Sequence, residues 1–221
     1  MTEVPAPRAS LKPLKISCTS TNCEEDQHCY LATKRMVAAN QRGACRSCGA
    51  RRVDWDRVHA RDLADAGYTC RMLKTELIRA HFWQIAIDVR AVNYARRKGK
   101  RGLRDAAAHR IRTSVSAAQP PRDGRQTPWS GNPLYYAQHA TATCCRRCIE
   151  EWHAIPRGRA LTADEVEYLT ALVCRYVDER LPQLSEDGEY VPAIRRRRER
   201  ATPPTAVHNP PFGVPTHAPP T

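Results

Sequence analysis

The chain has 221 residues, of which 36 are Lys or Arg and 23 are Asp or Glu, so its formal net charge is +13 at neutral pH. No run approaches the eighteen apolar residues that span a bilayer, and the N-terminus lacks the apolar stretch of a secretion signal. We therefore expect a cytoplasmic protein without a membrane segment. In a reducing compartment its ten cysteines favour metal ligation over disulfides.

The positive charge lies mainly in two segments. Residues 94–125 hold ten Lys or Arg against two Asp, and residues 193–200 hold five Arg against one Glu, while the rest of the chain is nearly neutral. Basic zones on a neutral body predict a polyanionic partner, most simply DNA or RNA, although such charge can also serve solubility alone. The predicted phosphate contacts are Arg96, Arg97, Lys98, Lys100, Arg101 and Arg104, helped by the arginines of 195–198.

A cysteine-rich segment spans residues 18–56, after an N-terminal arm, residues 1–17, in which three prolines predict a loose conformation. Within this segment, Cys45 and Cys48 are separated by two residues, and Gly49 follows them. This spacing is typical of a tight turn that points two thiolates at one metal ion, with a glycine that tolerates positive φ. The segment therefore predicts a structural zinc site.

The remaining ligands of this first site follow from the other cysteines of the segment. The predicted set is Cys23, Cys29, Cys45 and Cys48. The gap between Cys23 and Cys29 is less regular than a two-residue gap, so His28 or Cys18 could replace one of them. Buried thiols without a metal are the alternative interpretation.

Residues 69–117 are predicted to be helical. Over 69–97, apolar side chains recur at intervals of three, four and eight residues, which indicates one long amphipathic helix. Gly99 and Gly102 are expected to end this helix, because glycine disfavours a helix interior. A second helix is predicted over 103–117.

The C-terminal part of the predicted domain, residues 134–182, follows a loop, 119–133, whose Pro, Gly and polar residues suit either a pocket lining or a plain connector. The paired tyrosines of LYYAQ predict a short strand at the beginning of the segment 134–182. Thr162 and Glu165 then have the spacing of a capping box. They predict the beginning of a helix that runs to about Leu181.

A second group of metal-binding side chains lies in HATATCCRRCIEEWH, which packs three cysteines and two histidines into fifteen residues. The predicted ligands are His139, Cys145, Cys148 and His153. Cys144 competes with Cys145, because Cys144 lies four residues before Cys148 whereas Cys145 forms the two-residue spacing. Each histidine could instead be a hydrogen-bonded residue of the core.

Four stretches, DGRQTP, GNPLYYAQHATATCCRRC, EEWHAIPRGRALT and EVEYLTALVCRYVDERLP, resemble a family of bacterial cytoplasmic proteins known only as a domain of unknown function. The resemblance is strong from Asp123 to Pro182. It extends more weakly back through CRSCGARRVDWDRVHARD and the predicted long helix. It implies a single folded unit in the cytoplasm, and it transfers no catalytic residue.

These patterns together predict a mainly α fold with small β or turn elements that bind zinc, in an α+β domain over residues 18–182. The termini, 1–17 and 183–221, are expected to be flexible. The predicted function is that of a cytoplasmic zinc protein, with two ions, which binds nucleic acid. The sequence does not indicate an oligomeric state or a pathway.

The alternative prediction is a metal-dependent hydrolase resembling a nuclease. If only three protein ligands bind the second ion, a water can take the fourth position and its pKa falls toward ~7. Glu150 or Glu151 would then be the general base. His59 is a further candidate, because CRSCG followed by VDWDRVH loosely resembles zinc-framed nucleases, although its spacing from the aspartate departs from theirs. Redox chemistry at the clustered cysteines is a third option.

Overall fold

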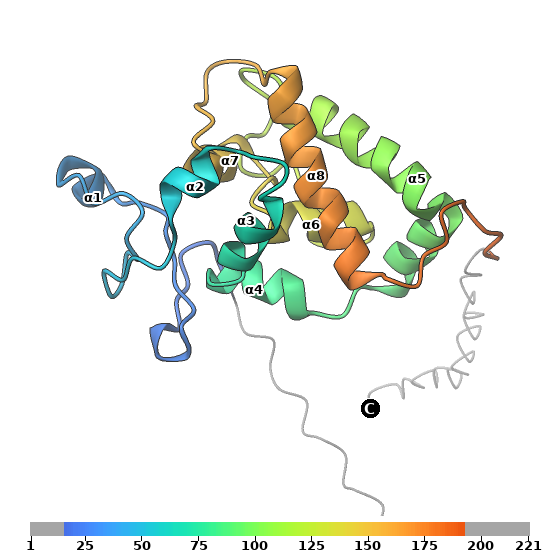
Figure 1. Ribbon diagram of the computed structural model, residues 1–221, viewed down its shortest axis with the longest axis horizontal. Helices are drawn as coiled ribbons and strands as arrows, with labels where there is room; N and C mark the ends of the chain where they lie inside the picture. Colours follow the sequence, from blue (N-terminus) through green and yellow to red (C-terminus); the bar gives the residue numbers. More distant parts are fainter. Residues whose placement is uncertain (1–15, 193–221) are drawn as a thin grey trace, which may run out of the picture.

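The computed structural model describes residues 16–192 of the chain. In that range the chain forms eight α-helices and one 3-10 helix (Figure 1). They are η1 (Cys23–Glu25), α1 (Lys34–Ala38), α2 (Trp55–His59), α3 (Ala66–Leu73), α4 (Leu77–Gln84), α5 (Val89–Ser114), α6 (Pro133–Ala140), α7 (Arg146–His153) and α8 (Ala163–Arg180).

The prediction of a mainly helical single domain is confirmed for the described range. Within residues 16–192, extended pairing is limited to two isolated bridges, Asn22 with Gln27 and His28 with Glu76. The predicted arm up to residue 15 and the arginine-rich tail from residue 193 lie outside the described residues. Between those limits, no helix combines the length and the apolar character required to cross a membrane.

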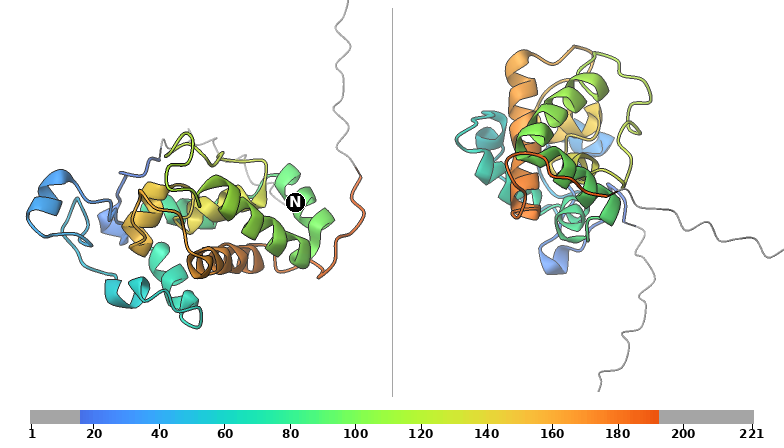
Figure 2. Two further views of the ribbon diagram at one scale, coloured as in Figure 1. Left: turned by 90° about the horizontal axis from the view of Figure 1, so that it is seen from above. Right: turned by 90° about the vertical axis from the view of Figure 1, so that its right-hand side faces the viewer.

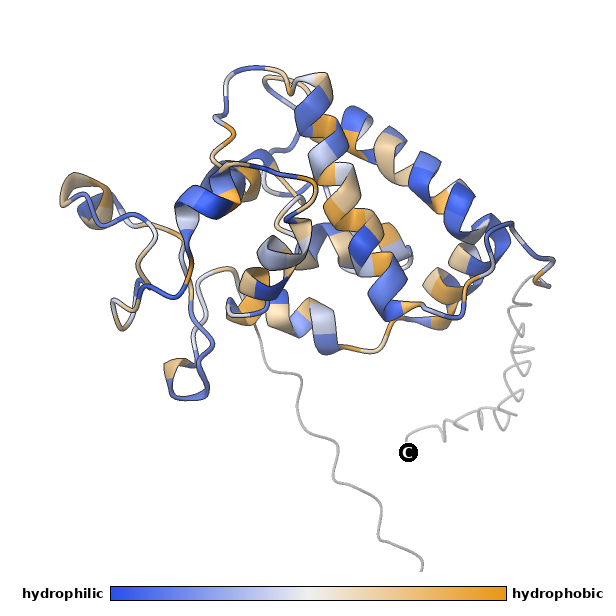
Figure 3. Ribbon diagram, in the orientation of Figure 1, coloured by the Kyte–Doolittle hydropathy of each residue, from blue (hydrophilic) through white to orange (hydrophobic). Residues whose placement is uncertain are grey.

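Helix α8 organises the core by packing against α3, α5 and α6, and it lies beside α5 in both views of Figure 2. Its residues Leu169, Val173 and Tyr176 are buried in the same core cluster as Leu103 and Ile111 of α5. Figure 3 shows the alternation of hydrophobic and hydrophilic residues along both helices that this one-sided burial requires. The cysteine-rich segment forms the opposite end of the domain from the N-terminal half of α5 (Figures 1 and 2).

The start of α8 agrees with its predicted capping box. The Thr162 side chain accepts a hydrogen bond from the Glu165 backbone N–H, and the Glu165 carboxylate accepts one from the Thr162 N–H. Arg159 also donates two hydrogen bonds to this carboxylate and is the largest cause of the lowered pKa of Glu165, to about 2. Local signals in the sequence therefore define this helix.

The single helix predicted over 69–97 is instead divided among α3, α4 and the beginning of α5. Extended backbone at Glu76 separates α3 from α4, because the neighbouring residues pair with the N-terminal segment. The His28 N–H donates to the Thr75 carbonyl (2.8 Å), and the Leu77 N–H donates to the His28 carbonyl (3.0 Å). A tertiary contact thus overrides the helical periodicity at this point.

The tyrosine pair predicted to begin a strand lies in α6. Asn132 caps this helix by accepting a hydrogen bond from the Leu134 N–H, and Pro133 occupies its first turn. Proline is favoured there because the first helical N–H has no partner within the helix. This N-terminal signal outweighs the short apolar pattern from which the strand was predicted.

At Gly99, α5 kinks rather than ends, with φ of 65°. The kink frees backbone N–H groups that bind residues 183–192, a segment assigned from the sequence to the flexible tail. Lys100 and Arg101 donate to the carbonyls of Ser185 (2.9 Å) and Glu186 (3.0 Å). A side chain on Gly99 would overlap the Asp187 backbone, so the segment and the glycine fit each other closely.

Candidate metal centres

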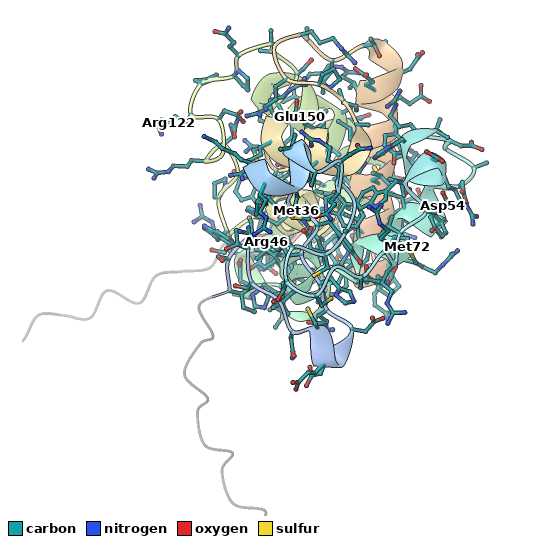
Figure 4. All side chains as sticks on the ribbon, turned by 90° about the vertical axis from the view of Figure 1, so that its left-hand side faces the viewer. Met36, Arg46, Asp54, Met72, Arg122 and Glu150 are labelled. Atoms are coloured by element: carbon teal, nitrogen blue, oxygen red, sulfur yellow. The ribbon has the colours of Figure 1, made fainter. Side chains whose placement is uncertain are left out.

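Site 1 consists of Cys23, His28, Cys45 and Cys48, whose potential ligand atoms all lie within 4.8 Å of one another. The Cys23 sulfur is 3.8 Å from the Cys45 sulfur, and the Cys48 sulfur is 3.5 Å from Nδ1 of His28. Three thiols and one imidazole form a donor set typical of structural zinc. Site 1 could therefore hold a metal ion. Figure 4 views this end of the molecule, with Met36 and Arg46 labelled.

The turn after Cys45 prepares its sulfur for ligation. The Gly49 N–H donates to the Cys45 carbonyl (2.9 Å), and Gly49 has φ of 76°, which glycine adopts without strain. Burial by itself raises the pKa of Cys45, but backbone N–H groups, including those of Cys48 and Ser47, together with His28, lower it to about 6. This thiol is thus predisposed to the thiolate form that binds metals.

His28, and not Cys29, occupies the remaining place in Site 1. The Nε2 atom of His28 lies 2.9 Å from Oδ1 of Asp26, which orients the ring and leaves Nδ1 facing the thiols. Cys29 was predicted as a ligand, but its thiol donates to the Cys18 carbonyl (3.1 Å) instead. Adjacent residues of an extended segment point to opposite sides, so only one of the two can face the site.

Site 2 consists of Cys144, Cys145 and Cys148, whose sulfurs also lie within 4.8 Å of one another. All three are buried. Cys145 is the N-cap of α7 and Cys148 lies in its first turn, so the beginning of the helix brings the two sulfurs together. Both members of the adjacent pair belong to the cluster, which could hold a metal ion.

The thiols of Site 2 interact strongly with one another. Hydrogen bonds from Cys144, Cys145 and Cys18 hold the pKa of Cys148 well below its ordinary value, with help from Arg79 and against the effect of burial. The interaction between Cys18 and Cys148 is also the largest cause of the raised pKa of Cys18. One thiolate is therefore favoured at the centre of the cluster.

A buried ion pair, Glu76 with Arg79, supports Site 2. The Arg79 guanidinium donates to the Cys148 sulfur (3.2 Å), to the His139 carbonyl (2.8 Å) and to the Glu76 carboxylate (3.0 Å). The Trp152 indole N–H donates to the same carboxylate (2.6 Å). This pair was missed from the sequence; its signal is an acid and a base three residues apart in an otherwise apolar stretch.

The two predicted histidine ligands lie outside Site 2. Nε2 of His139 is 3.2 Å from the Pro128 carbonyl oxygen, and its ring stacks on Trp129 at a centroid distance of 4.7 Å. Nε2 of His153 is 3.0 Å from the Thr141 carbonyl oxygen. Burial lowers the pKa of both histidines to about 4, which indicates neutral rings in the core.

The three candidate catalytic residues are engaged elsewhere. Glu150 pairs with Arg157 (2.8 Å), and Glu151 accepts a hydrogen bond from the Ala32 N–H (2.8 Å). His59 packs its ring against Trp55, and burial lowers its pKa. None of the three belongs to either metal cluster found among residues 16–192.

The basic residues predicted to contact nucleic acid divide into groups. Three of them pair with carboxylates of residues 183–192, in the pairs Arg96–Glu189 (2.5 Å), Lys100–Glu186 (4.0 Å) and Arg101–Asp187 (2.9 Å). Arg97 and Lys98 have no ion-pair partner in the described part of the chain. Arg104 lines a separate groove of about 820 Å³ between α5 and α8.

Two adjoining hollows lie between α5 on one side and the beginning of α6, with the loop residues just before it, on the other. They share Tyr94, Asn132 and Tyr135, and their volumes are about 340 and 430 Å³. Their basic lining residues are Arg90 and Arg97 in the smaller hollow and Lys98, His109 and Arg110 in the larger one. These hollows combine exposed positive charge with half-buried aromatic rings.

Comparison with known proteins places these features within a family. No solved structure matches this chain. The matched region, residues 67–178, contains all of Site 2, the Glu76–Arg79 pair and most of the helical core, whereas Site 1 precedes it. The chain belongs to the family described as a domain of unknown function, DUF4186.

Proposed function

We propose that the protein binds single-stranded nucleic acid in the two hollows beside α5, and that zinc ions in Site 1 and Site 2 stabilise the scaffold. The observation that carries the proposal is the grouping of basic and aromatic side chains in two adjoining hollows that share Tyr94 and Tyr135. Zinc is the favoured ion because thiolate and imidazole donors at close mutual spacing suit its tetrahedral coordination.

The charge of the smaller hollow suits phosphate groups. Arg90 and Arg97 are exposed and, among the described residues, form no ion pair. The nearby carboxylate of Asp88 is already occupied, because it accepts hydrogen bonds from the Ala91 and Gly131 N–H groups. A strand that neutralises these arginines would release counterions, which makes affinity fall with added salt.

The tyrosines supply surfaces on which bases can stack. Tyr94 and Tyr135 line both hollows, and the Arg110 guanidinium lies 5.0 Å from the centre of the Tyr135 ring. Base stacking on such rings contributes about 1–3 kcal/mol per base and tolerates any sequence. The larger hollow is also lined by the carboxylate of Asp105, whereas the smaller hollow has no acidic lining residue, so the smaller hollow is the stronger phosphate site.

The experiment compares two double variants of equal charge. Fluorescence anisotropy with labelled single-stranded DNA and RNA measures affinity for the full-length protein, Arg90→Ala/Arg97→Ala and the control Arg96→Ala/Arg101→Ala. We expect the first variant to bind at least about tenfold more weakly and its salt slope to fall by about 1.4, from two lost phosphate contacts. The control should change little, because the 183–192 segment already neutralises its arginines.

Equal losses in both double variants would mean that only total charge matters, which would contradict the assignment to the hollows. Tyr135→Leu separately tests stacking, and it should weaken binding by about 1–3 kcal/mol without altering the salt slope. Absence of binding to any single strand at low salt would refute the proposed function.

The metal-dependent hydrolase draws no support from the site geometry. The three sulfurs of Site 2 are buried, and both candidate glutamates make contacts elsewhere. A general base must lie within hydrogen-bond reach of the water that it activates. These contacts favour a structural role for an ion in Site 2.

A further inference from the structure

Trp129, in the loop before α6, is the exposed one of the four tryptophans, with an exposed fraction of 56%. Trp83 and Trp152 are buried, and Trp55 is half-buried. A single exposed apolar side chain is ordinary on a protein surface. The meaning of this one therefore depends on how its ring is held and on what lies beside it.

The Trp129 ring rests on two buried aromatic side chains. Its plane makes an angle of 7° with the His139 ring at a centroid distance of 4.7 Å. The Phe82 ring is inclined by 23° to it, with the centroids 5.5 Å apart. Parallel rings this close stack face to face, so His139 covers one face of the indole. The exposed surface of Trp129 therefore includes the opposite face.

The backbone on both sides of Trp129 is fixed to the helical core. Before it, the Pro128 carbonyl oxygen lies 3.2 Å from Nε2 of the same His139 that stacks on the indole. After it, the Gly131 N–H donates to the carboxylate of Asp88 (2.7 Å), the N-cap of α5. A ring that is already ordered loses little conformational freedom when it binds a ligand, which favours affinity.

Trp129 adjoins the smaller hollow beside α5. The three residues that follow it, 130–132, line this hollow together with Arg90 and Arg97. Consecutive Cα atoms are about 3.8 Å apart, so the backbone of Trp129 lies one residue from the edge of the hollow. An open indole face thus stands next to two arginines that form no ion pair among the described residues.

We propose that the open face of Trp129 stacks on an unpaired nucleobase of the strand whose phosphates contact Arg90 and Arg97. This inference rests on the proposed function and adds to it a base-binding residue outside the hollows. Every base presents a π-face, so the contact tolerates any sequence. A base within a duplex is already covered by its neighbours, so the indole favours single strands over duplexes.

The test uses two labelled strands of equal length, an oligothymidine and a strand of abasic sugar-phosphates, with the full-length protein. We expect Trp129→Leu to bind the oligothymidine at least about fivefold more weakly and the abasic strand as wild type does. Trp129→Phe keeps an aromatic face and should lose less affinity than Trp129→Leu. Arg90→Ala/Arg97→Ala, which removes phosphate contacts, should weaken the binding of both strands.

An equal loss of affinity for both strands in Trp129→Leu would assign the effect to the shape of the loop and overturn the stacking role. Acrylamide quenching of tryptophan fluorescence decides the matter in wild type, even where the variants fail to fold. Saturating oligothymidine should protect the exposed indole from the quencher. Unchanged quenching would remove Trp129 from the site and leave the arginine contacts intact, whereas a wild type that binds neither strand at low salt would sink the inference together with the proposed function.

Discussion

Replacement of Arg79 by methionine tests the buried network that supports Site 2. Methionine keeps much of the side-chain volume but removes the charge that faces Glu76. The Glu76 carboxylate is almost fully buried and would keep only the N–H groups of Trp152 and Tyr30 as partners. Breaking a buried ion pair from one side costs about 3–5 kcal/mol, because the remaining charge is uncompensated. That loss is a large share of a domain stability of about 5–15 kcal/mol.

Urea unfolding of the zinc-loaded proteins at neutral pH measures this cost. The control is Arg96→Met, which breaks an exposed ion pair with Glu189 and should cost no more than about 1 kcal/mol. Adding Glu76→Gln to Arg79→Met should recover part of the loss, because it removes the unpaired buried charge. A loss below about 1 kcal/mol in Arg79→Met would refute the reasoning.

Two further predictions concern the kink of α5 and a core histidine. Gly99→Ala should destabilise the protein by at least about 1 kcal/mol and increase hydrogen exchange over residues 183–192, because the added side chain would overlap the Asp187 backbone. The control Gly102→Ala has space for a methyl group and should stabilise the protein by about 0.5–1 kcal/mol. Equal effects of the two substitutions on stability would contradict the docking of residues 183–192 on α5. Burial lowers the pKa of His153 from 6.5 to about 4, so as the pH falls the His153 ring is protonated in the unfolded chain before it is protonated in the folded protein. The stability associated with the neutral ring is therefore fully present above about pH 6.5 and is lost as the pH falls toward 4. Between pH 7 and 5, wild type should therefore lose on the order of 2 kcal/mol more unfolding free energy than His153→Gln, and parallel pH profiles would contradict a neutral buried ring.

The features that the sequence predicted well are those fixed by neighbouring residues. The helix that begins after Thr162 has its capping box and its apolar face within a few turns, so both could be read locally. The turn from Cys45 to Gly49 likewise carries its own spacing and its glycine. Local signals of this kind do not depend on the rest of the fold.

The features in which the structure differs from the sequence-based predictions depend on contacts between distant segments. The break at Glu76 arises because its neighbours pair with His28, and nothing in the apolar periodicity indicates that contact. The same pairing helps to set which of His28 and Cys29 faces Site 1. His139 and His153 flank the cysteines in the sequence, but backbone carbonyls engage their rings, and such partners are set by the tertiary fold.

Similarly, the positions of the basic residues in the sequence did not predict which of them line the same surface. Arg96 and Arg97 are neighbours in the sequence, yet the first pairs with Glu189 while the second lines the hollow beside Tyr94. The deciding partner comes from residues 183–192, whose acidic character was not connected with α5 in the sequence analysis. A charge run therefore predicts an interaction more readily than it predicts the residues that make it.

Native mass spectrometry of the full-length protein, with thermal unfolding before and after chelation, tests the central claim most directly. Structural zinc contributes roughly 10–16 kcal/mol of apparent binding energy, so its removal should abolish or greatly lower the unfolding transition. We expect two zinc ions per chain, with one lost in Cys45→Ser and the other in Cys148→Ser. A protein that purifies without zinc, or that keeps its melting temperature after complete chelation, would contradict the claim that metal ions hold this fold together.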